Sequence, residues 1–293
     1  MKPAAEVDLH LHTNYSDGVY SPSDLVRLAA RAGMKAIAIA DHDHLGGIDE
    51  AMEAAEKLGV ELLPAVELSS QWGGYMDIHL LGYGFDHRHP ELLARLEDFR
   101  TYRQGRNEQV VARVNERLLQ EGRDPIDFAQ VLALAEGALG RPHIAQILVA
   151  SGHARHSEDA FQRYLVPCNV PKKYFPMDEA IALLHRAGGV AVLAHPLYIT
   201  SDRKRFEALL DEFTTMGLDG VEALCSGFTK DDRDYYLTQA RRRGLLVTGG
   251  SDFHGIEQSG IAIGTGFGNL AVGYSCVEEI LSALGRLRVK QTA

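Results

Sequence analysis

The chain has 293 residues and a formal net charge of −10, from 30 Lys and Arg residues against 40 Asp and Glu residues. Its 45% hydrophobic and 24% charged residues are typical of a folded globular protein and exclude disordered and collagen-like chains. Duplex DNA and anionic membranes are unfavourable partners for this charge, because both require a basic surface. A local site for a phosphorylated ligand remains compatible with it.

The expected strands and helices alternate along most of the chain. The strands cover residues 7–11, 35–40, 61–67, 76–82, 190–194, 220–224 and 245–249. The helices cover residues 22–32, 46–58, 178–187, 203–216 and 231–243. Pro22 and Gly33 mark the first helix well, because proline favours the first helical position and glycine follows the last. This order predicts a mainly parallel α/β sheet, and about seven strands are compatible with a TIM-like barrel.

Residues 90–166 differ from the rest, because their pattern is helical and charge-rich and no strand is evident. We expect a helical insertion there, with the barrel formed by residues 1–89 and 167–293. An insertion between barrel strands suggests a lid or a substrate domain.

The cysteines and the N-terminus indicate the compartment. Cys168, Cys225 and Cys276 are far apart and form no CxxC pattern, which argues against a disulfide framework and for a reducing compartment. The first ten residues contain one Lys and lack the apolar stretch of a signal peptide. No apolar run approaches the roughly 18 residues that a membrane span requires. We therefore expect a cytoplasmic protein without a membrane partner.

Imidazoles and carboxylates lie within or directly after the expected strands. They are His10, His12, Asp41, His42, Asp43, His44, Glu67, His79, His195, Asp252 and His254. The carboxyl ends of parallel barrel strands converge on one rim, where we expect these side chains to meet. His10 and His12 share one face of their strand, because alternate residues point the same way.

Each of these residues has an ordinary alternative when it is taken alone. A single histidine such as His79 is more often hydrogen-bonded or on the surface, and Glu67 could form an ion pair at the rim. Taken together, a purely structural role would require a separate buried partner for every imidazole and carboxylate. Imidazole and carboxylate are the ligands of zinc, manganese and iron, so we predict a multinuclear metal site.

The same residues form a set of motifs. These are Asp8-Leu-His10-Leu-His12, Asp17-Gly18, Asp41-His42, Glu67, His79, Ala194-His195-Pro196 and Gly250-Ser251-Asp252-Phe253-His254. Together they resemble the motifs of the PHP (polymerase and histidinol phosphatase) family, from Asp8 to His254 but not in the helical middle. The resemblance implies a distorted seven-stranded (β/α)7 barrel with up to three metal ions at the strand ends. More closely, the chain is similar to PHP phosphoesterases with a helical insertion that act on nucleoside 3′,5′-bisphosphates.

The resemblance also implies which residues hold the metal ions. The first set is His10, His12, Glu67 and Asp252, the second is Glu67, His79 and His195, and the third is Asp17, His42 and His254. Some family members have histidine where this chain has Asp17, and an oxygen ligand favours manganese, with zinc or iron as alternatives. We expect two to three divalent ions per chain. Asp8 and Asp41 are candidates to orient ligating imidazoles, or to form helix caps and turns instead.

The expected activity is hydrolysis of a phosphomonoester of a small nucleotide. The first choice of substrate is a nucleoside 3′,5′-bisphosphate, cleaved to the 5′-monophosphate and phosphate by attack of a metal-activated hydroxide. Proteins of the same branch are proposed to trim short RNA, so a 5′→3′ exoribonuclease is an alternative. A histidinol-phosphate phosphatase is another, and a metal-binding scaffold without catalysis is the alternative outside the enzymes. No ligand position carries an apolar residue, which favours an enzyme.

Four residues in or next to the insertion are candidates for binding substrate. Arg141 and His143 begin an expected helix, where they could hold a second phosphate, although Pro142 is also an ordinary helix start. Lys172 and Lys173 precede two aromatic residues that could flank a base, although a lysine pair is usually a solvated surface.

Overall fold

The computed structural model describes residues 5–134, 139–256 and 259–291. The chain divides into two compact units, one made of Met1–Ala94 and Tyr174–Ala293, the other of Arg95–Lys173. We call the first the barrel unit and the second the insertion.

Seven strands form the wall of the barrel unit, in the order β1-β2-β3-β4-β6-β7-β8, and a short eighth strand, β5, pairs with β3. The strands are β1 (Val7–Leu11), β2 (Ala36–Ile39), β3 (Glu61–Trp72), β4 (Tyr75–Tyr83), β5 (Phe175–Pro176), β6 (Val190–Leu193), β7 (Gly220–Cys225) and β8 (Leu246–Gly250). Just beyond β8, the Asp252 amide donates to the His10 carbonyl at 2.9 Å and the His12 amide donates to the Phe253 carbonyl at 3.0 Å. These bonds bring the two ends of the sheet together. The predicted seven-stranded α/β barrel is confirmed, and it is nearly closed.

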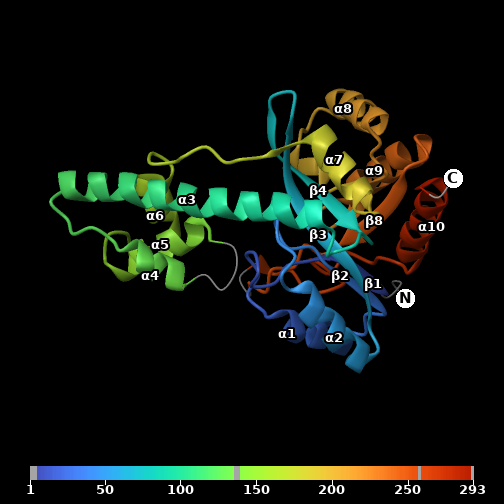
Figure 1. The fold of residues 1–293 in the computed structure, drawn as a ribbon, viewed down its shortest axis with the longest axis horizontal. Helices are drawn as coiled ribbons and strands as arrows, with labels where there is room; N and C mark the ends of the chain where they lie inside the picture. Colours follow the sequence, from blue (N-terminus) through green and yellow to red (C-terminus); the bar gives the residue numbers. More distant parts are fainter. Residues whose placement is uncertain (1–4, 135–138, 257–258, 292–293) are drawn as a thin grey trace. The chain divides into compact units, whose positions relative to one another are not determined.

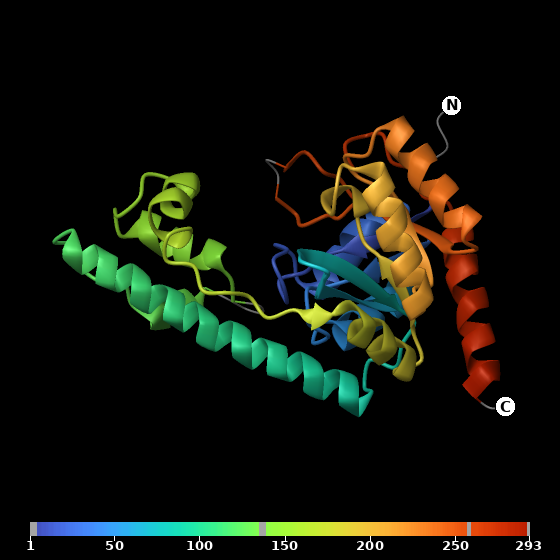
Figure 2. The ribbon, with the colours of Figure 1, turned by 90° about the horizontal axis from the view of Figure 1, so that it is seen from above.

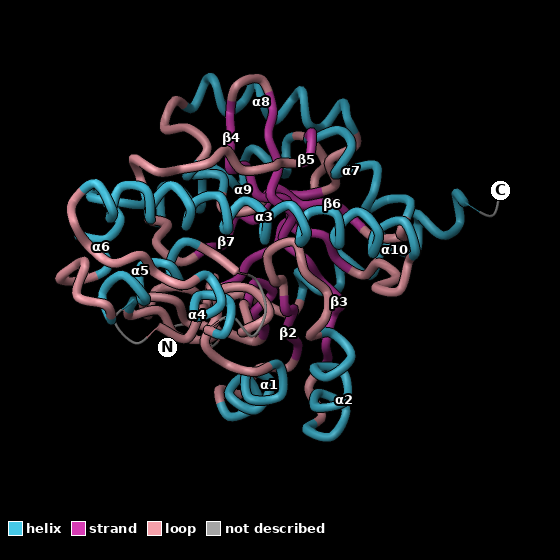
Figure 3. Tube along the Cα trace, turned by 60° about the vertical axis from the view of Figure 1, so that its left-hand side comes forward, coloured by secondary structure: helices cyan, strands magenta, loops and turns pink. Residues whose placement is uncertain are grey.

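The helices of this unit lie outside the strands (Figure 3). They are α1 (Pro22–Arg31), α2 (Ile48–Leu58), α7 (Met177–Arg186), the 3-10 turn η2 (Pro196–Tyr198), α8 (Arg203–Met216), α9 (Lys230–Arg242) and α10 (Ser275–Gln291). Helices α1 and α2 lie side by side (Figure 1), and Leu25 and Val26 of α1 are fully buried against β1 and β2. At the start of α1 the Ser21 hydroxyl accepts from the Asp24 amide, which satisfies one of the free amides of the first turn.

One strand runs in a direction that the sequence did not predict. Strand β4 is antiparallel to both of its neighbours, β3 and β6. The prediction that β3 ends at Glu67 is wrong, because β3 continues to Trp72 and turns into β4 through Gly73 and Gly74, with φ of 55° and 88°. A two-residue hairpin of type I′ has positive φ at both positions, which glycine adopts without steric cost. This reversal places the first half of β4, with His79, at the same rim as the ends of the parallel strands.

Helix α10 was also absent from the sequence-based assignment. Its residues Val277, Ile280 and Leu284 recur at helical spacing and are buried. Gly84 allows close packing there, because an added Cβ would lie 2.3 Å from a methyl carbon of Leu284. The helix therefore covers part of the barrel wall.

The insertion is helical and has a core of its own. Its elements are α3 (Pro90–Gln120), whose first residues belong to the barrel unit, α4 (Phe128–Ala133), α5 (Arg141–Ala150), α6 (Ser157–Ala160) and the π-helical turn η1 (Phe161–Leu165). Figure 2 shows α3 as one uninterrupted helix. Val114, Leu118, Ile144, Leu148 and Tyr164 are fully buried in one apolar cluster.

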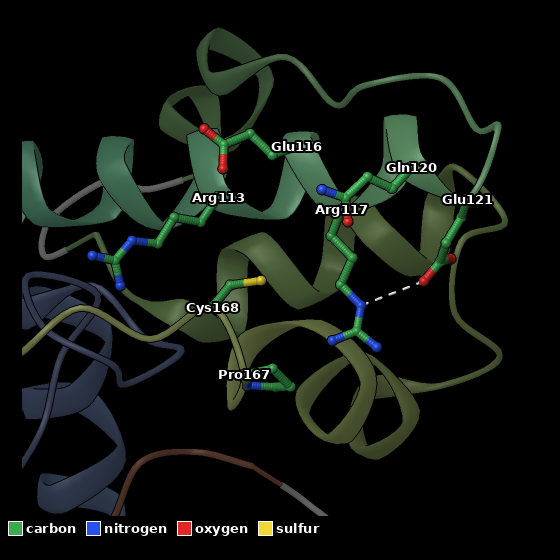
Figure 4. A pocket seen from close by; sticks show the side chains of 7 residues that line it. All are labelled: Arg113, Glu116, Arg117, Gln120, Glu121, Pro167 and Cys168. Carbon is green, nitrogen blue, oxygen red and sulfur yellow. Dashed lines mark hydrogen bonds and ion pairs between the residues drawn. The ribbon is translucent and has the colours of Figure 1, made fainter.

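A hollow of about 590 Å³ lies on the insertion (Figure 4). Arg113 and Arg117 of α3 line it together with Cys168. The two arginines are balanced by Glu116 and Glu121 in the same lining, so the hollow has no surplus of positive charge. Of the helices in the described residues, none has both the length and the apolar character that a membrane crossing requires.

Candidate metal centre

Strand β1 brings two imidazoles to the rim. His10 lies near the end of β1 and His12 directly follows it, and their side chains are completely removed from solvent. Two glycines of the motifs pack directly against the backbone that carries them. A Cβ on Gly250 would lie 2.4 Å from the His10 Cβ, and one on Gly18 would lie 2.2 Å from the His12 carbonyl oxygen. These glycines therefore allow neighbouring segments of the chain to pack closely against the backbone that carries His10 and His12.

The residues of the first predicted set converge. The His10 Nε2 lies 3.4 Å from the Glu67 Oε2 and 3.5 Å from the Asp252 Oδ1. The His12 Nε2 lies 3.4 Å and 3.2 Å from the same two oxygens. Four potential ligand atoms from three different strands or strand ends thus face one another.

The second set meets at the other oxygen of the same carboxylate. The Glu67 Oε1 lies 3.0 Å from the His79 Nδ1 and 2.9 Å from the His195 Nε2. The two imidazole nitrogens are themselves 3.2 Å apart. Glu67 therefore presents one oxygen to each of the two sets, which is the arrangement of a bridging ligand.

The third set is more open to solvent. The Asp17 carboxylate, about half exposed, lies 3.2 Å from the His254 Nε2 and 3.7 Å from the His42 Nε2. The other nitrogen of His42, Nδ1, lies 3.0 Å from the Glu67 Oε2. All nine residues of the three sets are thus brought together at one rim.

Ligand atoms that lie within 4.8 Å of one another form three overlapping groups among the described residues. The groups are His12, Asp17, His42 and His254; His10, His12 and Glu67; and His42, Glu67 and His79. The His10 Nε2, the His12 Nε2 and the Glu67 Oε2 are buried, yet none makes a hydrogen bond within the described part of the chain. Buried polar atoms that face one another without bonding are costly. The donor set therefore fits divalent cations such as manganese, zinc or iron.

The electrostatics of the carboxylates favour their charged forms. Burial alone would raise the pKa of Glu67, but the imidazoles of His42, His79 and His10 hold it well below its usual value. Burial likewise acts to raise the pKa of Asp252, and the attraction of the nearby His10 and His12 imidazoles lowers it instead. Both carboxylates are therefore ionised at neutral pH, as cation binding requires.

The imidazoles of His10 and His12 are equally buried, but their pKa values shift in opposite directions. Desolvation acts to lower the pKa of His10, but the carboxylates of Glu222, Glu67 and Asp252 outweigh it and raise the pKa well above its usual value. The pKa of His12 is lowered, first by burial and then by the charges of His254 and His42, against the opposing effect of Asp252. The two pKa values differ because Glu222 adds a negative charge beside His10, whereas His254 and His42 act on His12.

Glu222 is a site residue that the sequence analysis missed. It lies in β7 and is fully buried; its Oε1 is 3.0 Å from the His10 Nδ1, and its Oε2 accepts from the His195 amide at 2.8 Å. A carboxylate on the far nitrogen of an imidazole fixes the tautomer and aims the other nitrogen. A single charged residue within the apolar run 220–225 was the signal that could have identified it.

The sequence leaves two roles open for Asp8, orienting an imidazole or forming a turn. Its carboxylate accepts from the amides of Ser251 and Gly264, at 2.8 Å and 2.7 Å, and so ties β1 to the last loops of the barrel. The contacts favour the turn role, because they are to backbone amides, among them the His10 amide at 3.4 Å.

Asp41 reaches an imidazole only through another side chain. It accepts from the Ser16 hydroxyl at 2.6 Å and from the Thr13 hydroxyl at 2.6 Å. The Ser16 Oγ lies 3.3 Å from the His12 Nδ1. Asp41 therefore holds the loop that follows β1, and Ser16 contacts His12.

Backbone strain is concentrated near this rim. Four described non-glycine residues have positive φ, and two of them, His195 (φ 22°) and Asp252 (φ 56°), are predicted ligands. A third, Asp43, directly follows His42 and accepts from the Ser69 amide of β3 at 2.9 Å. Such conformations cost about 1–3 kcal/mol each and persist where the surroundings impose them.

The four residues that were predicted to bind substrate belong to the insertion. The Arg141 guanidinium lies over the Phe161 ring, 5.6 Å from its centroid, and the His143 Nδ1 accepts from the Gly140 amide at the start of α5. Lys173 pairs with Asp98, and Lys172 is exposed. The contacts of Arg141, His143 and Lys173 are thus made to other residues of the insertion.

Comparison with known proteins identifies the family of the chain. Residues 8–215 match the family model of the PHP domain. A 5′-3′ exoribonuclease of Haemophilus influenzae is 37% identical over 84% of this chain and 89% of its own length. A 3′,5′-nucleoside bisphosphate phosphatase of Chromobacterium violaceum is 31% identical over 89% of this chain and 91% of its own.

A solved structure is similar over nearly the whole chain. A protein of Bifidobacterium adolescentis assigned as a metal-dependent phosphoesterase superimposes with a TM-score of 0.78 at 34% identity, covering 96% of each chain. The family, the barrel and the imidazole–carboxylate cluster lead to one assignment. The chain belongs to the PHP-domain family of metal-dependent phosphoesterases, and it is a hydrolase.

Proposed function

We propose that the protein removes the 3′-phosphate from nucleoside 3′,5′-bisphosphates and releases the nucleoside 5′-monophosphate. The observation that carries this proposal is Glu67, whose two oxygens face two different sets of imidazoles within a cluster of nine potential ligands. The similarity to the bisphosphate phosphatase of C. violaceum supports the choice of substrate. Membership of a hydrolase family disfavours the alternative of a scaffold without catalysis.

The proposed ligands are the three sets of the sequence analysis. His10, His12 and Asp252 with Glu67 would hold one ion, and His79 and His195 with Glu67 would hold a second. Asp17, His42 and His254 would hold a third. Because Asp17 adds a hard oxygen donor to this last set, we propose manganese.

The protein orients the imidazoles of the site and keeps its carboxylates charged. Bound divalent ions would polarise the phosphoryl oxygens and make water nucleophilic at neutral pH. Glu222 keeps the His10 Nε2 directed at Glu67 and Asp252, and its bond to the His195 amide fixes the strained turn after β6. Buried Glu67 keeps its negative charge because the imidazoles that surround it, above all those of His42, His79 and His10, lower its pKa. The ligand atoms are thus set in place before substrate arrives, which lowers the cost of reorganisation during the reaction.

The substrate is tested with purified protein, manganese and adenosine 3′,5′-bisphosphate. We expect release of phosphate and accumulation of adenosine 5′-monophosphate, with little release from histidinol phosphate. Good turnover of histidinol phosphate or another monoester, without turnover of the bisphosphate, would contradict the substrate assignment.

A 5′→3′ exoribonuclease on short RNA is the second candidate. The relative of H. influenzae, 37% identical to this chain, carries that activity in its name. A 5′-phosphorylated oligonucleotide would then be shortened stepwise from its 5′ end. Comparing kcat/KM for this oligonucleotide and for the bisphosphate, in the same buffer, decides which substrate is preferred.

The insertion is proposed to act as the substrate domain. Arg141 begins α5, and a guanidinium can hold a phosphate through two parallel hydrogen bonds. We expect Arg141→Ala to raise KM for the bisphosphate more than it lowers kcat. Arg100→Ala is the matched control, because Arg100 lies on α3 and pairs with Glu97 one turn away. Equal effects of the two variants would contradict this role; His143, Lys172 and Lys173 are examined in the same way.

The place of reaction is proposed to be the cytoplasm. The three cysteines are free and buried, which suits a reducing compartment.

A further inference from the structure

Two aromatic side chains of the barrel unit stand out by their exposure. Within the described residues of this unit, Tyr198 and Phe267 are the aromatics classed as exposed, at 69% and 55%. Large aromatic side chains gain most from burial, so two that remain in solvent are unusual. They come from different loops: Tyr198 ends the turn η2, and Phe267 lies beyond β8.

Both aromatics flank one bare glycine. A Cβ on Gly227 would lie 3.8 Å from the Tyr198 hydroxyl oxygen and 3.8 Å from the Phe267 Cε2. Gly227 has φ of 78°, a conformation that residues with a side chain rarely adopt. The space between the two rings is thus kept free of a side chain.

Tyr198 also stands directly beside the metal centre. Its ring centroid lies 5.3 Å from that of His195, at an interplanar angle of 57°. The connection between the two residues is short and stiff, because Pro196 follows His195 and the Tyr198 amide donates to the His195 carbonyl at 3.1 Å. A ligand whose phosphate is held next to His195 therefore has an exposed aromatic face within reach of its remaining part.

We propose that Tyr198 and Phe267 form a stacking platform for the base of the nucleotide whose phosphate is held at the metal centre. This inference rests on the proposed function, because it takes the substrate to be a nucleotide. Base–aromatic stacking tolerates different bases, since every base has a π face. The platform therefore selects for a nucleobase over a base-free sugar phosphate and discriminates little between bases.

The test compares a ligand that has a base with one that lacks it. Affinities for adenosine 5′-monophosphate and ribose 5-phosphate are measured calorimetrically in the presence of manganese. Tyr198→Ala should weaken adenosine 5′-monophosphate about 5- to 150-fold and leave ribose 5-phosphate unchanged. Phe267→Ala should act in the same direction, and Tyr198→Phe should restore the affinity because it keeps the ring. Tyr198→Leu is a second variant that retains an apolar side chain at the exposed position.

Met76→Ala is the matched control, because Met76 on β4 is 67% exposed and lies outside the platform. Unchanged affinity for adenosine 5′-monophosphate in Tyr198→Ala and Tyr198→Leu would overturn the platform, and so would an equal loss for both ligands. Failure of the proposed function has a different result: the unaltered protein would then release no phosphate from the bisphosphate, whatever the binding data show for the variants.

Discussion

The barrel unit and the insertion both bury ionisable groups, but they treat them differently. In the insertion, buried Arg106 donates to the Val170 carbonyl at 2.8 Å, and Asp159 accepts from the Arg155 amide at 2.9 Å. In the barrel unit, the His10 Nε2, the His12 Nε2 and the Glu67 Oε2 are buried without hydrogen bonds. Several imidazole nitrogens and carboxylate oxygens that face one another in a buried cluster are the donor set of a divalent cation. Arg106 and Asp159 thus stabilise the fold of the insertion, whereas His10, His12 and Glu67 are arranged to bind a cation.

The largest effect is expected from Glu67→Gln, which removes the charge that two imidazole sets share. We expect loss of bound metal and a fall in kcat of about 10²- to 10³-fold or more. Metal content and phosphate release are measured on the same sample. Glu121→Gln is the control, because Glu121 pairs with arginines of the insertion. Full metal content in Glu67→Gln would contradict the conclusion that the buried charges of the barrel unit bind metal.

Leu148→Ala tests the insertion, where we expect a loss of stability and no loss of metal binding. Leu148 is fully buried in the core of the insertion, so the truncation should lower the free energy of unfolding by about 2–5 kcal/mol. The affinity for manganese should not change, because the ligands lie in the other unit. Denaturant unfolding and a calorimetric metal titration measure the two quantities. Leu119→Ala, at a position 63% exposed on α3, should cost less than about 0.5 kcal/mol.

Glu222→Gln tests whether a residue that only orients His10 contributes to metal binding. The amide can still accept from the His195 amide, but the negative charge beside the His10 Nδ1 is gone. We expect metal affinity to fall about 10- to 100-fold, as is usual for residues that orient ligands. Glu279→Gln is the matched control, since Glu279 binds Arg241 instead. If both variants bound metal as the unaltered protein does, Glu222 would be a structural residue only.

Ser16→Ala should have the smallest effect. Its hydroxyl lies 3.3 Å from the His12 Nδ1 and donates to Asp41 at 2.6 Å. Loss of one hydrogen bond costs about 0.5–1.5 kcal/mol, which corresponds to a fall in metal affinity of about 2- to 12-fold. The measurement is the same metal titration, with Ser282→Ala on α10 as control, where the hydroxyl accepts from Arg286. A larger fall than that of Glu222→Gln would mean that the loop after β1, and not β7, determines the geometry of the site.

Much of the barrel was predictable because its local pattern is strong. Helix α8 has the predicted bounds, 203–216, and α1 begins at Pro22 as expected. The candidate ligand residues could be named because their motifs resemble those of the PHP family. The reversal of β4 was missed, although Gly73 and Gly74 between two strand-like runs are a recognised hairpin pattern. Helix α10 was missed as well, although its apolar spacing is helical.

The sequence by itself determined the elements and the kinds of ligand atom, because periodicity, caps and motifs act over a few neighbouring residues. Only the tertiary structure decided which partners those atoms have. Glu222 reaches His10 across 212 positions of sequence, and Glu67 reaches His195 across 128. Asp8 stands in the same motif as His10 and yet binds backbone amides. The direction of a buried carboxylate depends on the strands that surround it, and no local pattern specifies those neighbours.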